Sequence, residues 1–385
     1  MGAIPAASRS KRDAPPRRCR LPAVRVRGTC HVYQAVDLGF AVDLSRAEQI
    51  FAGEQLSQHF KKPRRAPEAQ QLQRHSFRIA QGGFPVQIGA FRSEGPVEVV
   101  LWEFGAATIA YQIPIDCEYE ALVGLCDALW DNAELLRDAR GRAEQLLRAI
   151  REAVDKPALG TRIEDYVVFE LKLEDGGRVE SLWTEHAAVT ASILRAEPEK
   201  LSDEEIKDAL SIRCAYVRNE VVLVDWFAAL LVGDDMEDER LVLELTVAEL
   251  LELRDLDEQL DRGIDAAYNL LTRKRSWLAS LSTRAADLSQ VSQLQADAAV
   301  LFEGVDNALK LLGDQYLARL YRVASERFHL PQWDVSIERK LRLLDGIYEK
   351  MSNRAASRRF EVLEIVIIAL IAISTAAPFL ASALP

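Results

Sequence analysis

The sequence predicts an α+β domain near the N-terminus, then a long coiled-coil-like α-helical region, and one transmembrane helix at the C-terminus. Three observations carry this prediction. Short β-rich runs alternate with helical patterns up to residue 232, strand-like runs then cease, and the chain ends in a long uncharged segment. A length of 385 residues exceeds one typical domain. The expected parts are a basic arm at 1–28, an α+β domain at 29–232, a helical region at 233–330 and a helical stalk at 335–385.

The basic arm is the only part of the chain with a strong positive charge. The formal net charge of −11 argues against a general nucleic-acid binder, because phosphate contacts need a basic face. We therefore expect contact with RNA or anionic lipid, if it occurs, only through this arm. A disordered tail is preferred over an organelle transit peptide, because several prolines interrupt an amphipathic helix. The arm's basic residues are Arg9, Lys11, Arg12, Arg17, Arg18, Arg20, Arg25 and Arg27.

Residues 29–232 contain the strand and helix signals of one main sheet with covering helices. Around Gly105 the run VEVVLWEFGAATIAYQI has the form of a hairpin. Helical spacing covers 119–154 and 179–196, and Ser202 with Glu205 forms an S-x-x-E helix start. The other strand candidates are HVYQAVDLGFAVDL, FPVQIGAFR, YVVFELKL and EVVLVDWFAALLV.

Beyond Gly233 apolar residues step by three or four positions, which is typical of coiled-coil packing. A single helix over residues 239–328 would be about 135 Å long, so we expect a turn that folds the region back. That turn is expected within 280–293 or at Gly304 or Gly313. Pro331 is expected to end this region, with a new helix from about Val335 into the terminal segment.

The terminal segment 365–384 reads IVIIALIAISTAAPFLASAL, which contains no charge and is long enough to span a bilayer. This predicts a tail-anchored, single-pass protein of a bacterial inner membrane. By the positive-inside rule Arg354, Arg358 and Arg359 form a cytoplasmic flank. A helix buried in a protein core is the alternative. The predicted anchor residues are Ile365, Ile367, Ile368, Leu370, Ile371, Phe379 and Leu380.

Four segments together resemble the "required for meiotic nuclear division" family of membrane-anchored proteins. They are the VVLW-type hairpin, VLELTVAELLELRDLDEQLDRGIDAAYNLL, GDQYLARLYRVASERF and RRFEVLEIVIIALIAI. The resemblance covers 97–380. It implies a C-terminally anchored homo-oligomer facing the cytoplasm or mitochondrial matrix, linked in mitochondria to translation of membrane proteins, and it implies no catalytic residue. The basic arm and Pro378 depart from the family pattern.

Chemistry-bearing motifs are absent from the sequence. Its five cysteines form no CxxC pair and its five histidines are scattered, so we predict neither a metal site nor a cofactor. The acidic run GDDMEDE lacks the spacing of a calcium loop and is interpreted as the start of a helix. Four tryptophans are interpreted as packing residues rather than binding anchors. These are Trp102, Trp183, Trp226 and Trp333.

These observations predict a non-enzymatic scaffold or interaction protein, held at the membrane lipid bilayer and assembled into a homo-oligomer. A subunit of a pore or ion-transport assembly is the alternative, although the single span and the absence of a GMN motif count against a magnesium channel. An enzyme with a site built from scattered residues stays open at this point.

Overall fold

The computed structural model describes residues 24–52, 60–61, 75–174, 178–272, 289, 292–293, 295–302 and 314–382, with some side chains inside these ranges left out. The predicted basic arm therefore lies mostly outside the described residues. Its last part does not, since β1 begins at Arg25.

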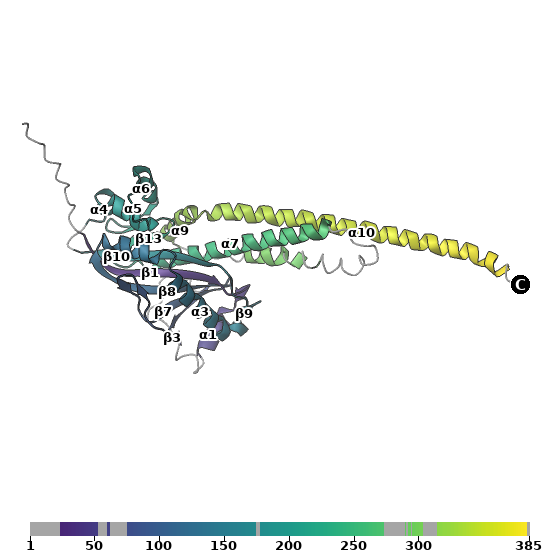
Figure 1. Cartoon of the computed structure of the whole chain (residues 1–385), viewed down its shortest axis with the longest axis horizontal. Helices are drawn as coiled ribbons and strands as arrows, with labels where there is room; N and C mark the ends of the chain where they lie inside the picture. Colours follow the sequence, from purple (N-terminus) through teal and green to yellow (C-terminus); the bar gives the residue numbers. More distant parts are fainter. Residues whose placement is uncertain are drawn as a thin grey trace, which may run out of the picture.

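A mixed nine-stranded sheet forms the core of the wider end of the described molecule, far from the C-terminus (Figure 1). Neighbouring strands are antiparallel, except for β10 and β13, which are parallel. Two small two-stranded sheets lie beside it, β2 (Ala41–Val42) with β9 (Val154–Asp155), and β5 (Gln87–Ile88) with β6 (Phe91–Arg92). In spatial order the main sheet contains β11 (Arg213–Cys214), β12 (Val221–Val224), β13 (Ala228–Val232), β10 (Ile163–Leu173), β1 (Arg25–Asp37), β8 (Ala106–Glu118), β7 (Val97–Trp102), β4 (Ser76–Gln81) and β3 (Phe60–Lys61).

The predicted hairpin around Gly105 is confirmed as the β7–β8 connection. Gly105 has a φ of +109°, a conformation that side-chain-bearing residues rarely adopt. A Cβ atom there would lie 2.1 Å from the carbonyl oxygen of Gly39, so the close approach of the two loops also requires glycine.

Both faces of the sheet are buried, each under its own layer of helices. Along β1, Val32 and Val36 belong to one hydrophobic core and Tyr33 and Ala35 to the other, because alternate side chains point to opposite faces. The first core is covered by α2, α3 and α5. The shorter helices are α1 (Leu44–Ala52), α2 (Ala121–Leu129), α3 (Ala133–Ala149), α4 (Ser181–Thr184), α5 (Ala187–Arg195) and α6 (Asp203–Ala209). At the start of α6 the predicted cap is confirmed, since the Ser202 side chain accepts a hydrogen bond from the Glu205 N–H.

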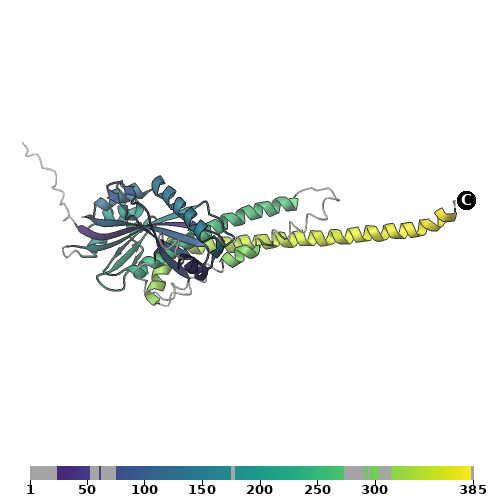
Figure 2. The ribbon, with the colours of Figure 1, turned by 90° about the horizontal axis from the view of Figure 1, so that it is seen from below.

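The second face is covered by α7 (Glu237–Thr272), α9 (Gln315–Arg327) and the beginning of α10 (Leu330–Ser382). Further along, α7 and α10 leave the sheet side by side and form a projecting arm (Figures 1 and 2). The two helices run in the same direction. Lys340 Nζ of α10 lies 2.7 Å from an Asp257 carboxylate oxygen and 2.6 Å from one of Asp261, both on α7. The turn predicted before α9 falls almost entirely outside the described residues.

Charged residues are buried where α7 crosses the sheet. Glu244 of α7 is fully buried, and its Oε2 accepts a hydrogen bond of 3.1 Å from Arg78 Nη2 on β4. Arg78 Nη1 also donates to Glu98 Oε2 on β7, at 2.7 Å. Nearby, burial and the charge of Arg240 lower the pKa of His31 to about 4, so that this imidazole is neutral at pH 7. The network ties α7 to one position on the sheet, because a buried ion without its partner is costly.

The predicted transmembrane helix is wrong, and with it the tail anchor and the single-pass inner-membrane placement. Among the described residues no helix carries an apolar stretch long enough to cross a bilayer. Within α10 the described side chains of the apolar run, from Ile365 to Thr375, are exposed. Glu364 precedes this stretch directly.

The break predicted at Pro331 is also wrong in position. α9 ends at Arg327 and α10 begins at Leu330, five residues before the expected start at Val335. Proline is compatible with a first helical turn, because the N–H that it lacks would have no intrahelical acceptor there. His329, with a φ of +57°, makes the corner between the two helices.

We predict that Glu244→Ala lowers the free energy of unfolding by about 3–5 kcal/mol, because it leaves Arg78 and Arg240 buried with one partner fewer. Denaturant titration followed by circular dichroism measures this. Glu258→Ala on the exposed side of α7 is the control and should cost at most about 1 kcal/mol. Equal costs for the two variants would contradict a role for the buried network.

Candidate functional site

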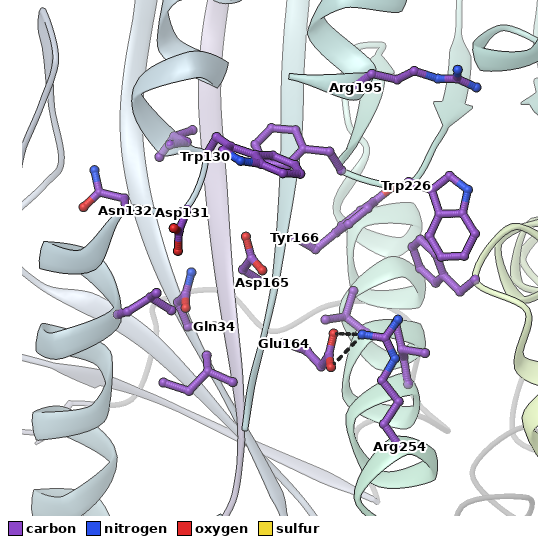
Figure 3. A pocket seen from close by; sticks show the side chains of 17 residues that line it. Gln34, Trp130, Asp131, Asn132, Glu164, Asp165, Tyr166, Arg195, Trp226 and Arg254 are labelled. Atoms are coloured by element: carbon purple, nitrogen blue, oxygen red, sulfur yellow. Dashed lines mark hydrogen bonds and ion pairs between the residues drawn. The ribbon is translucent and has the colours of Figure 1, made fainter. Parts of the chain in front are cut away.

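The strongest candidate site is a pocket at a notch in the main sheet. β10 continues for four residues beyond the end of its pairing with β13, which begins at the Val167 to Ala228 register. Residues 163–166 therefore have β1 on one side and no β13 partner on the other. The pocket at this notch has a volume of about 870 Å³ and is lined from both helical layers (Figure 3).

Two exposed tryptophans stand at the pocket. Trp130 follows α2 and is 60% exposed, and Trp226 lies in the β12–β13 turn and is 43% exposed. The Trp130 ring packs against Phe227 with centroids 5.5 Å apart, and Trp226 lies 5.0 Å from the His329 ring. Large aromatic rings that stay this exposed beside a cavity are typical binding surfaces.

A buried carboxylate holds the turn that carries Trp226. Asp225 is fully buried, and its Oδ1 accepts the Trp226 N–H at 2.8 Å and Arg327 Nε at 2.7 Å. Its Oδ2 accepts Arg195 Nε at 2.9 Å, and its carbonyl oxygen accepts the Tyr166 hydroxyl at 3.0 Å. Each oxygen of Asp225 is thus used, and the turn is held to β10, α5 and α9.

The loop that carries Trp130 is held in a similar way. Asn132 caps α3, because its Oδ1 accepts the N–H groups of Glu134 and Leu135 and its amide donates to the Ala128 carbonyl. Between the tryptophan and this cap, Asp131 adopts a φ of +47°, which aspartate tolerates better than most residues. The side chains of Trp130 and Asp131 are therefore presented from a preorganised loop.

Both arginines of the pocket are already neutralised by carboxylates. Arg254 Nη1 donates to the two carboxylate oxygens of Glu164 at 2.7 and 2.8 Å. Arg195 is paired with Asp225, Asp208 and Glu205. Neither guanidinium is therefore available as an unpaired positive charge for an anionic ligand.

The polar groups that are left over are hydrogen-bond acceptors. Within the described part of the chain, the carboxylates of Asp131 and Asp165 make no hydrogen bond or ion pair with another side chain; that of Asp165 accepts only its own backbone N–H, and Gln34 Oε1 is buried without a donor. Gln34 and Asp165 are register partners on β1 and β10, and Figure 3 shows them with Asp131 below Trp130. Desolvation by the surrounding protein, together with the charge of Asp131, raises the pKa of Asp165. The carboxylates of Asp131 and Asp165 therefore have no positive partner among the described residues, and a bound cation would supply one.

A second cavity, of about 1010 Å³, opens where β1 ends and α7 leaves the sheet. Asp37 and Asp255 line it, and Glu252, which is buried, has one oxygen without a donor. Burial, together with the charge of Asp255, raises the pKa of Asp37 to about 7, although a hydrogen bond from the Gly39 N–H opposes the shift. In the searched, described residues no group of three or more metal-ligating side chains is arranged to hold a metal ion.

The residues predicted from sequence lie elsewhere. Ile365, Ile367, Ile368, Leu370 and Ile371 are exposed along the outer part of α10, away from the pocket. The side chains of Phe379, Leu380 and the three flanking residues Arg354, Arg358 and Arg359 lie outside the described set.

Sequence reasoning missed the pocket itself. From the sequence, Trp226 is interpreted as a packing residue, and Trp130 is not considered. Trp102 is buried, and Trp183 and Trp333 are partly buried and pack against the two hydrophobic cores, so the packing interpretation is confirmed for these three. The available signal was the Trp-Asp-Asn sequence at a break between two helical patterns, because a polar helix cap next to a tryptophan marks a surface position.

Comparison with known proteins gives a family without an assigned activity. The family model described as "Uncharacterized protein MJ0711, N-terminal domain" matches residues 27–239, which is more than half of the chain. A curated relative, "Uncharacterized protein MJ0711" of Methanocaldococcus jannaschii, is 25% identical over 196 residues, or 50% of this chain and 59% of the relative. No solved structure matches. The resemblance to the "required for meiotic nuclear division" family is not tested by these comparisons and stays a prediction.

We predict that Asp37→Asn stabilises the protein at pH 8 and that this gain shrinks as the pH falls toward 5. The folded pKa of about 7 exceeds the ordinary value of 3.8, so the folded state binds this proton more tightly and the group's contribution to stability is lost as the pH rises from about 4 to 7. Asparagine removes the titration and keeps an acceptor for Gly39. Melting temperatures across this pH range measure the effect, with Asp265→Asn on the exposed side of α7 as control. A pH-independent difference would contradict it.

Proposed function

We propose that this chain, which belongs to the family described as "Uncharacterized protein MJ0711, N-terminal domain", is a binding protein whose notch pocket takes up an organic cation. The ligand group is a primary ammonium or a guanidinium. It would lie against the Trp130 ring and be neutralised by Asp165 and Asp131.

One observation carries the proposal: the polar groups left without partners in the pocket accept hydrogen bonds, whereas its two arginines are paired. A cationic donor would satisfy Asp131, Asp165 and Gln34 Oε1 together. An anionic ligand would have to displace Glu164 from Arg254 or the three carboxylates from Arg195, and would face two carboxylates besides. Such a site rejects anions by charge.

The affinity for an isolated cation is expected to be modest. A partly desolvated cation–π contact contributes about 1–2 kcal/mol and a charge-assisted hydrogen bond about 1.5–3 kcal/mol. The sum of about 2.5–5 kcal/mol corresponds to a dissociation constant of roughly 0.2–15 mM. The pocket thus suits recognition of a charged group that belongs to a larger partner, which agrees with the predicted interaction protein.

We predict that N-acetyl-lysine methylamide binds in calorimetric titration and that its uncharged norleucine analogue does not. Asp165→Asn should weaken lysine binding at least tenfold, about 1.4 kcal/mol, by removing one carboxylate charge. Trp130→Ala should also weaken it. Asp127→Asn is the matched control, because it removes an exposed charge from the neighbouring α2 without touching the pocket lining. Equal binding of the two ligands would refute the proposal.

A second candidate function, self-association into a homo-oligomeric scaffold, is supported by the outer part of α10. Four consecutive apolar residues, Ile365, Val366, Ile367 and Ile368, are 49–65% exposed. Successive helical residues point about 100° apart, so these side chains surround the helix rather than form one stripe. Such a helix is covered on all sides only within a bundle of several copies. The pore alternative needs a membrane span and is not retained.

We predict that the full-length chain is a trimer or larger by light scattering, and that a chain ending at Glu364 is a monomer. The physical reason is the loss of the apolar surface that follows Glu364. Leu343→Gln, which replaces an isolated exposed leucine of the same helix, should leave the mass unchanged. An unchanged mass for the shortened chain would contradict assembly through this segment.

A further inference from the structure

The notch leaves part of a strand edge open, and this edge extends the proposed function to a definite partner. We propose that the cation bound beside Asp165 is the side chain of an extended peptide segment, which pairs with the free edge of β10 as a short additional strand. The proposal rests on the cation-binding function above and adds backbone recognition to it.

The orientation of the backbone groups follows from strand geometry. Val167 N donates to Phe227 O at 3.1 Å, so its N–H points toward β13. Backbone groups alternate between the two edges of a strand, and those of Asp165, two residues earlier, therefore point the same way. β13 has not begun at that level. The N–H and C=O of Asp165 thus face the notch. Outside the strand ladders no other described residue bonds to either, and the N–H is shared only with the carboxylate of Asp165 itself.

No further described strand of the chain pairs with this edge, because the backbone groups of Asp225 that would do so form other hydrogen bonds. Continuing the parallel ladder by one step would pair the Asp165 N–H with the Asp225 carbonyl. That carbonyl instead accepts the Tyr166 hydroxyl at 3.0 Å, and the Asp225 N–H donates to Ala228 O at 3.0 Å. The β12–β13 turn is therefore closed on itself, and the edge of β10 stays available.

The same geometry places the side chains of an added strand. Residues opposite one another on neighbouring strands point to the same face of a sheet. A lysine or arginine opposite Asp165 would enter the acceptor-lined side of the pocket, with Gln34, Asp131 and Trp130. The next residue would point to the other face, toward the apolar wall formed by Leu250 and Phe328. The favoured segment is thus extended, with a basic residue flanked by apolar ones.

Backbone pairing predicts a signature that simple charge attraction does not produce. Only every second amide of an added strand faces its neighbour, whereas the amides between them face away. N-methylation blocks a single donor at a chosen position. Moving one methyl group along the peptide should therefore alternate between strong loss of binding and little effect.

The experiment compares the full-length protein's binding of N-acetyl-lysine methylamide with that of the blocked peptide Val-Lys-Val and its singly N-methylated forms, by calorimetry. The expected result is that the peptide binds at least tenfold more tightly than the lysine derivative, and that N-methylation removes this gain at alternate positions only. The same peptide with norleucine in place of lysine should lose most of its affinity.

The other outcomes separate the two proposals. If the lysine derivative binds but the peptide binds no better, or N-methylation has no effect, edge pairing is overturned and cation binding stands. If neither charged ligand binds, the proposed function itself fails. If the norleucine peptide binds as well as the lysine peptide, with the alternating effect of methylation, a strand is recognised without its charge, and both the cation function and the basic character of the partner are overturned.

Discussion

The burial of the first half of α7 against the sheet is the constraint on which the other features depend. Residues 241–253 of this helix are buried throughout, and they include fully buried Glu244. A carboxylate in such a place needs its counter-ion, and Arg78 from β4 supplies it. This pairing defines where α7 crosses the sheet. Further along the same helix Arg254 then reaches Glu164 and closes one wall of the notch.

The notch itself is a consequence of unequal strand lengths. β10 has 11 residues and pairs with β1 along its length, whereas β13 has 5. The notch stays open because the polar side chains around it already form hydrogen bonds and ion pairs with other residues. Asp225 is occupied by two arginines, and Asn132 is occupied by the α3 cap. What stays unpaired is an acceptor-rich surface beside one strand edge. Charge recognition and backbone recognition therefore come from the same piece of structure.

One end of the β1–β10 pair concentrates acidic residues, because the two strands are antiparallel. β1 ends at Asp37, and β10 starts just before Glu164 and Asp165. α7 adds Glu252 and Asp255 at the same level, where burial, followed by the charges of Asp37 and Asp255, raises the pKa of Glu252. Arg162 and Arg254 neutralise part of this charge through ion pairs with Asp255 and Glu164, respectively. The two cavities are thus neighbours in an acidic end of the domain, and the proposed preference for cations follows from its charge.

Local residue patterns were enough to predict the hairpin at Gly105, the cap at Ser202 and the change from strands to long helices after Gly233. Each depends on residues close together in the chain, where backbone preference and apolar periodicity act directly. The sequence also led to an incorrect transmembrane helix, because no described helix is long and apolar enough to cross a bilayer. The notch, in contrast, depends on contacts between distant parts of the chain. Gln34, Asp131 and Asp165 stand far apart in sequence, and only the register of β1 with β10, and the packing of two helical layers on the sheet, bring them together.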